Sequence, residues 1–208
     1  MKIAVEAARI GVFGGAFDPP HNAHVALAKT ALEQFALDAL YVIPTGQAWH
    51  KPRVLSSPEH RLAMTRLAFE NVPRVVVDDR ELQRTGSTFT IDTLHVLQAE
   101  HPRAQIHLFI GADQFVNFKQ WRRWQEILDI AIICIADRLQ STLGQAQFDA
   151  YAPLQHRLFT LELPLMPVSA TQIRDSISLG SATTSEIARF VPEPVARYIS
   201  LHKLYRAA

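Results

Sequence analysis

Short apolar segments alternate with longer segments of helical pattern along most of this 208-residue chain, and this alternation constrains the fold more than any other feature. Several of the short segments are apolar throughout, which is typical of parallel strands covered on both faces. The predicted strands are residues 9–14, 39–44, 74–78, 105–111, 130–136 and 157–163. The predicted helices are residues 23–35, 57–67, 91–99, 124–128, 170–179 and 194–202. The sequence therefore predicts an α/β fold with a mainly parallel sheet and helices on both faces.

Length and charge limit the organisation and the partners of the chain. At 208 residues without a repeat or a Ser/Gly-rich linker, we expect one domain over residues 1–208. The formal net charge of +1 offers no general attraction for a polyanion, so we expect neither nucleic acid nor membrane as a partner. No signal peptide is evident at the amino terminus, and no apolar stretch approaches the about 18 residues that a spanning helix needs. We therefore expect a cytoplasmic protein.

The single cysteine, Cys134, lies inside an apolar run. It cannot form an intramolecular disulfide, and we expect it to be a small buried hydrophobic side chain rather than a reactive thiol, because no positive charge is evident beside it.

The segment that follows the first predicted strand carries the strongest functional pattern. It reads GGAFDPPHNAH over residues 14–24 and leads into a helix. The glycines Gly14 and Gly15 allow a close approach of the backbone to a ligand, or a positive φ, near a helix start that favours phosphate. His21 and His24 are three residues apart, so both side chains can donate to one anion. The alternative is that the glycines form a simple turn, that Asp18 and Asn22 cap the helix, and that the histidines lie at the surface.

A second pattern, PVSATQIR over residues 167–174, opens a helix near the carboxyl end. Ser169 is a predicted N-cap, and Arg174 supplies a permanently charged fork one turn later. The alternative is that Ser169 only caps the helix and that Arg174 lies in solvent.

Both segments resemble the signatures of the nucleotidyltransferase superfamily, GG(T/S)FDPxHxGH and (I/V)S(S/A)TxIR, with Ala23 where the family usually has glycine. The resemblance implies a Rossmann-like, doubly wound sheet, and a C-terminal helical portion from about residue 168 that completes an ATP site. It implies that His21, His24 and Arg174 are catalytic. The implied ATP-binding residues are Gly14, Gly15, Phe17, His21, His24, Asp113, Arg138, Ser169, Thr171 and Arg174.

Three further stretches resemble the nicotinate mononucleotide adenylyltransferase family. They are PTGQAWHKP at residues 44–52, STFTIDTL at residues 87–94, and the segment from Gly111 to Leu128. The family usually has Pro-Pro where Ala48-Trp49 stands, Tyr at Phe89, and Pro-Gly after Arg138, where this chain has Leu-Gln. The resemblance implies that the Thr90 backbone N–H meets the nicotinate carboxylate; the alternative for this segment is a plain Ser/Thr cap of the helix. Trp121 is our candidate for stacking on the pyridine ring, with core packing as the alternative, and we expect Trp124 to pack in the core. Asp113 is placed to hold ribose hydroxyls or a hydrated metal, and the alternative is that it only caps a helix. The implied mononucleotide-binding residues are Gly15, Ala16, His50, Lys51, Thr88, Thr90 and Trp121.

The activity implied by these resemblances is transfer of AMP from ATP to nicotinic acid mononucleotide, giving deamido-NAD and pyrophosphate. Mg²⁺ is expected as a cofactor held through the ATP phosphates, with no direct side-chain ligand. The alternatives are use of nicotinamide mononucleotide, a phosphopantetheine adenylyltransferase, which usually has Thr where His21 stands, and a nucleotide sensor without catalysis. The oligomeric state is left open, with a homo-oligomer as one alternative.

Overall fold

The computed structural model describes residues 8–46, 55–138, 156–163, 166–180 and 183–206, and its centre is a six-stranded sheet. The order of the strands is β3-β2-β1-β4-β5-β6, and every neighbouring pair is parallel. Their bounds are β1 Arg9–Gly15, β2 Ala39–Pro44, β3 Val75–Val77, β4 Gln105–Gly111, β5 Ala131–Arg138 and β6 Leu158–Leu163. The predicted parallel α/β fold is confirmed.

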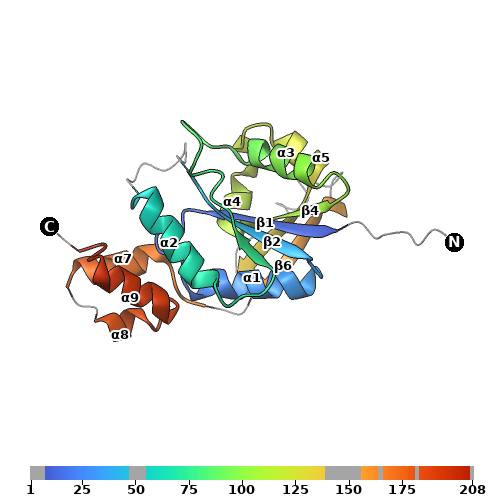
Figure 1. Ribbon diagram of the computed structural model, residues 1–208. Coiled ribbons are helices and arrows are strands. Elements are labelled where there is room, and N and C mark those ends of the chain that lie inside the picture. The colour runs from blue at the N-terminus through green and yellow to red at the C-terminus, as the bar shows by residue number, and fades with distance from the viewer. Residues whose placement is uncertain (1–7, 47–54, 139–155, 164–165, 181–182, 207–208) are drawn as a thin grey trace.

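Helices cover both faces of the sheet (Figure 1). One face carries α1 Asn22–Gln34, α2 Pro58–Phe69, α7 Ala170–Ser178, α8 Thr184–Ile187 and α9 Glu193–Leu201. The other face carries α3 Thr90–Glu100, α4 Ala112–Val116, the 3-10 helix η1 Phe118–Gln120 and α5 Trp124–Ile130. Among the described helices, none has the length and apolar character that crossing a membrane requires.

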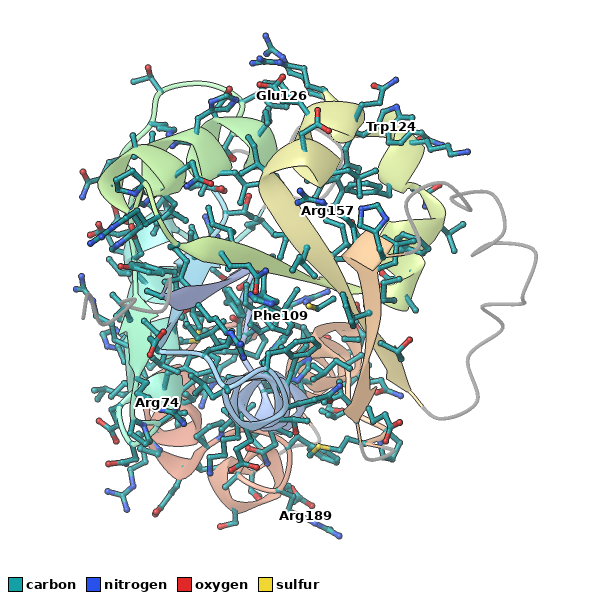
Figure 2. All side chains as sticks on the ribbon, turned by 90° about the vertical axis from the view of Figure 1, so that its right-hand side faces the viewer. Arg74, Phe109, Trp124, Glu126, Arg157 and Arg189 are labelled. Atoms are coloured by element: carbon teal, nitrogen blue, oxygen red, sulfur yellow. The ribbon has the colours of Figure 1, made fainter. Side chains whose placement is uncertain are left out.

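The core consists of two apolar clusters, one on each face of the sheet. Along β4, Leu108 packs with the α3 and α5 side and Phe109 with the α1 side, because successive strand residues point to opposite faces. Figure 2 shows Phe109 near the middle of the molecule, between the sheet and α1. This double burial explains why the central strands β1, β2, β4 and β5 are apolar without alternation. Cys134 is buried on β5, and burial raises the pKa of its thiol, so the predicted inert role is retained.

The sequence-based boundaries differ from the structure in a few places. The short elements α4, η1 and α8 have five residues or fewer, too few for a periodic pattern. The strand predicted at residues 74–78 is shorter, since Arg74 has a φ of 65° and the Asp78 carboxylate accepts hydrogen bonds from Arg80 in the turn that follows. Ile130 ends α5 instead of starting β5, because the helix runs directly into the strand.

Candidate active site

A cavity of about 940 Å³ lies at the carboxyl ends of the central strands β1 and β4. From β1 the chain proceeds to β2 and β3 on one side of the sheet, and from β4 to β5 and β6 on the other. The helices that follow β1 and β4 therefore leave on opposite faces and open a crevice between them, the usual ligand site of such sheets. Three helices of nine or more residues, α1, α3 and α7, begin at this cavity. Their amino ends give the cavity a positive character.

The residues that the sequence marks as ATP or mononucleotide contacts gather here. His50, Lys51 and the side chain of Arg138 lie outside the described residues, so their predicted roles stay predictions. The others line the cavity: Gly14, Gly15, Ala16, Phe17, His21, His24, Thr88, Thr90, Asp113, Trp121, Ser169, Thr171 and Arg174.

The two histidines stand at the start of α1 with stacked rings, whose centroids are 3.7 Å apart at an interplanar angle of 17°. The backbone N–H of His21 donates to Nδ1 of His24 at 3.1 Å. A ring nitrogen that accepts a hydrogen bond carries no proton, so a neutral His24 holds its proton on Nε2. His24 is therefore oriented as an Nε2–H donor. His21 is the N-cap residue of α1, so the alternative in which Asp18 caps this helix does not hold.

The loop between β1 and α1 takes its tight conformation at an unexpected residue. Positive φ falls on Phe17, at 46°, and on neither Gly14 nor Gly15. The ring of Phe17 is buried and packs edge-on against His24, with centroids 5.1 Å apart. A Cβ added at Gly14 would meet no atom within 4 Å, so the glycine leaves open space beside the backbone. Of the two uses of glycine that the sequence suggested, close approach of a ligand is the one that the geometry supports.

Asp18 connects three distant parts of the chain around the cavity, and sequence reasoning missed this role. Its side chain is only 1% exposed. The carboxylate accepts hydrogen bonds from the Tyr205 hydroxyl at 2.7 Å and the Ser56 backbone N–H at 3.1 Å. Burial and the adjacent carboxylate raise the pKa of Tyr205, since both disfavour a phenolate. No sequence pattern relates residues so far apart.

Arg61 is a second residue that no sequence pattern singles out. Its guanidinium is buried and donates to the backbone carbonyls of Ala16, Thr45 and Ser56, at distances of 3.1, 2.7 and 3.1 Å. Ala16 and Thr45 directly follow β1 and β2. Arg61 therefore fixes the loops at the carboxyl ends of two neighbouring strands.

The start of α7 forms one side of the cavity. Ser169 is its N-cap, with the Gln172 N–H donating to Ser169 Oγ at 3.2 Å. Arg174 donates from Nη2 to Thr171 Oγ1 at 3.1 Å and from Nη1 to the Asp18 carbonyl at 2.8 Å. The alternative that leaves Arg174 in solvent does not hold, because its guanidinium is held at the cavity wall. This region, with the histidine pair, is called the α7 side below.

The start of α3 and Trp121 form the opposite side, called the α3 side below. Phe89 is the N-cap of α3 and makes no side-chain cap hydrogen bond, so the reading of this segment as a plain Ser/Thr cap does not hold. Thr88 is buried, and its Oγ1 lies 3.4 Å from that of Thr45. Trp121 lines the cavity and packs its ring against Phe118 at 5.5 Å. Trp124 also packs against Phe118, at 6.3 Å, but does not line the cavity.

The cavity also holds carboxylates. Glu81 accepts a hydrogen bond from Thr93 Oγ1 at 2.7 Å, and Arg84 donates to the same hydroxyl at 2.8 Å. Asp113, in the first turn of α4, occupies the room that Gly111 leaves, since a Cβ at Gly111 would lie 2.5 Å from its Oδ1. Within the described ranges, no three His, Cys, Asp or Glu side chains are grouped as metal ligands.

Comparison with known proteins agrees with this arrangement. The family model described as cytidylyltransferase-like matches residues 12–176. The chain is 52% identical to a probable nicotinate-nucleotide adenylyltransferase of Albidiferax ferrireducens, over 96% of this chain and 99% of that protein. It is 38% identical to a protein of the same name from Methylibium petroleiphilum, over 95% of this chain and 92% of that one.

The fold is similar to that of a solved nicotinic acid mononucleotide adenylyltransferase of Plasmodium falciparum, with a TM-score of 0.78, 17% identity, and coverage of 95% of this chain and 97% of that one. The cavity, the two signature segments and the full-length similarity lead to one conclusion. The chain belongs to the cytidylyltransferase-like nucleotidyltransferases and, within them, to the nicotinate-nucleotide adenylyltransferase family.

Proposed function

We propose that the protein transfers the adenylyl group of ATP to nicotinic acid mononucleotide, giving deamido-NAD and pyrophosphate in NAD biosynthesis. The observation that carries this proposal is the convergence of α1, α3 and α7 on one cavity, with a histidine pair on one side and a tryptophan on the other. The volume of about 940 Å³ is near the upper end of ligand pockets, which suits two substrates bound together.

The α7 side fits the triphosphate of ATP. Ser169, Thr171 and Arg174 offer hydroxyls, first-turn N–H groups and a guanidinium, all at the cavity wall. Arginine binds phosphate oxygens through two parallel hydrogen bonds, and here two contacts already fix its orientation. We place the leaving pyrophosphate against this side.

The α3 side fits the pyridine mononucleotide. The Thr90 backbone N–H, at the first residue of α3, is suited to receive the nicotinate carboxylate. Trp121 offers a π-face to the positively charged pyridine ring. Gly15 and Ala16, between the two sides, bring the backbone close to where the mononucleotide phosphate would lie.

The reaction needs charge stabilisation more than proton transfer. An oxygen of the mononucleotide phosphate forms a bond to the α-phosphorus of ATP, while the bond from that phosphorus to the bridging oxygen of the β-phosphate breaks. The electron pair leaves with pyrophosphate. The phosphate nucleophile is already anionic, so no general base is required. His24 Nε2–H, His21 and Arg174 donate to phosphoryl oxygens and lower the repulsion between the two anions.

We further propose that Mg²⁺ accompanies ATP, bound through phosphate oxygens. In the residues that the structure describes, three carboxylates line the cavity. Asp18 accepts hydrogen bonds from Tyr205 and Ser56, and Glu81 accepts one from Thr93. Asp113 is the third, and its carboxylate accepts from the adjacent Gln114 side chain. This set suits a hydrated magnesium ion that keeps most of its waters, rather than a cage of protein ligands. Such an ion would neutralise part of the triphosphate charge.

We place the reaction in the cytoplasm.

The deciding experiment measures pyrophosphate release with Mg-ATP and each of three acceptors: nicotinic acid mononucleotide, nicotinamide mononucleotide and phosphopantetheine. We expect the highest kcat/KM with the acid mononucleotide. A higher value with the amide would favour that substrate instead. Binding of ATP without pyrophosphate release from either pyridine mononucleotide would contradict the proposal and favour a nucleotide sensor.

A further inference from the structure

We infer that the side chain of Arg122 makes the site prefer the acid mononucleotide over the amide. This inference rests on the proposed function and concerns the α3 side of the cavity. Arg122 lines the cavity beside Trp121, Phe89 and Thr90. It therefore places a guanidinium among the residues proposed to hold the pyridine ring.

Arg122 is held in place by an aromatic ring. Its Cζ lies 4.6 Å from the centroid of the Phe89 ring, a distance at which the cation and the π-face attract each other. Phe89 is the N-cap residue of α3, and the Thr90 N–H follows directly. The guanidinium and the amino end of α3 thus lie on the same side of the cavity, and both favour an anion there.

The charge of Arg122 is available to a ligand. In the part of the chain that the structure describes, no carboxylate lies within ion-pair distance of Arg122. The neighbouring residue behaves differently: Arg123 forms an ion pair with Glu126, and neither of them lines the cavity. Figure 2 shows Glu126 at the outer edge of the molecule, on the α5 side. Two adjacent arginines therefore point to different environments.

Among the described residues, a second charged side chain that lines the α3 side opposes an anion. Glu81 lines the cavity and accepts a hydrogen bond from Thr93, which also lines it. A carboxylate that enters this side meets the negative charge of Glu81, and the backbone N–H groups of α3 carry only partial charges. Arg84 donates to the same Thr93 hydroxyl but does not line the cavity, so of the side chains that the structure describes along the α3 side it is Arg122 that supplies a full positive charge.

The two substrates differ in the charge that Arg122 meets. The pyridinium ring of the acid mononucleotide carries a carboxylate, so the ring and its substituent sum to zero. The amide leaves the ring with a net positive charge. A guanidinium at the rim attracts the carboxylate and repels the amide substrate, and both effects favour the acid. For a partly solvated pair, this corresponds to a preference on the order of tenfold.

The test compares Arg122→Gln with the matched control Arg123→Gln. Both variants remove one positive charge from adjacent exposed positions, but only the first alters the cavity wall. We measure kcat/KM for both mononucleotides with each variant and with the unaltered protein. Arg122→Gln should lower kcat/KM for the acid about tenfold, mainly through KM, and leave the value for the amide unchanged or higher. Arg122→Lys should retain part of the preference, and Arg123→Gln all of it.

Two outcomes would overturn the inference. One is an acid-to-amide ratio in Arg122→Gln equal to that of Arg123→Gln. The other is an equal loss for both substrates, which would indicate a structural role. Salt gives an independent readout, because raising ionic strength should reduce the ratio in the unaltered protein more than in Arg122→Gln. Failure of the proposed function would look different, since the unaltered protein would then release no pyrophosphate with either substrate.

Discussion

His24 is the residue whose donor atom the geometry identifies, because its Nδ1 already accepts the His21 N–H. His24→Ala removes the Nε2–H donor, and we expect kcat to fall by about 10²–10³-fold, as for the loss of one donor to a developing anion. His95→Ala is the control, since His95 is exposed and interacts with Glu126 away from the cavity. Steady-state pyrophosphate release measures both. Near-native turnover of His24→Ala would exclude the histidine from the mechanism.

Tyr205 makes the stability of the protein depend on alkaline pH. Its pKa is raised above the ordinary value of 10.0 by burial and by Asp18. The folded state therefore holds the phenol proton more tightly than the unfolded state does. The contribution of Tyr205 to the free energy of unfolding is complete below about pH 10 and is lost as the pH rises above that value. Tyr205→Phe removes this dependence, and also the hydroxyl that donates to a buried carboxylate, which destabilises the protein by about 1–3 kcal/mol at neutral pH.

The measurement is urea unfolding at pH 7, 9 and 10.5. We expect the difference in unfolding free energy between the unaltered protein and Tyr205→Phe to narrow at the highest pH. Tyr198→Phe is the control, because the Tyr198 hydroxyl lies within hydrogen-bond distance of His60 in a less buried place than that of Tyr205, and its loss should have a smaller effect at neutral pH. A difference that stays constant with pH would disprove the coupling to the titration of Tyr205.

At the scale of single elements, Ser169 both caps α7 and lines the cavity. Ser57 caps α2 by the same type of hydrogen bond, from the N–H three residues on, but does not line the cavity. Ser169→Ala and Ser57→Ala should each destabilise the fold by about 1 kcal/mol. Only Ser169→Ala should also raise the KM for ATP, because the cap orients the amino end of α7. Thermal unfolding and ATP titrations separate the two effects, and an equal rise of KM in both variants would refute the role of α7.

The elements that the sequence predicts well are those whose own residues carry a pattern. Strands buried on both faces read as apolar runs, and α2 and α7 start at the serines that cap them. The short elements α4, η1 and α8 could not be found, because five residues or fewer display no period. The conformation of Phe17 was also missed, because a positive φ was considered only for the glycines before it, as one of their two possible uses.

At the scale of the whole molecule, the contacts that the sequence could not predict are those that the fold creates between distant segments. Asp18 and Tyr205 are 187 positions apart, and Arg61 binds carbonyls that follow two different strands. Such pairs have no fixed spacing, so no local pattern reveals them. The cavity residues themselves were predictable only because their motifs resemble those of a family, and because parallel strands bring their carboxyl ends to one edge.

The joining of two sides into one cavity predicts how ligands stabilise the fold. Deamido-NAD carries both an adenylyl and a pyridine half, so it should raise the melting temperature at lower concentration than AMP or nicotinic acid mononucleotide alone. A ligand at about 100 times its Kd adds roughly 2.7 kcal/mol of stability. Arg174→Ala should reduce the shift caused by Mg-ATP but not that caused by the mononucleotide, because Arg174 lies on the α7 side.

Arg123→Gln, outside the cavity, should leave all these shifts unchanged. Thermal shift curves over a range of ligand concentrations measure each case. If Arg174→Ala weakened the binding of the mononucleotide as strongly as the binding of ATP, the two sides would not be separate subsites. The triphosphate and the pyridine nucleotide would then share the same cationic wall, and the proposed placement of ATP on the α7 side and of the mononucleotide on the α3 side would have to be abandoned.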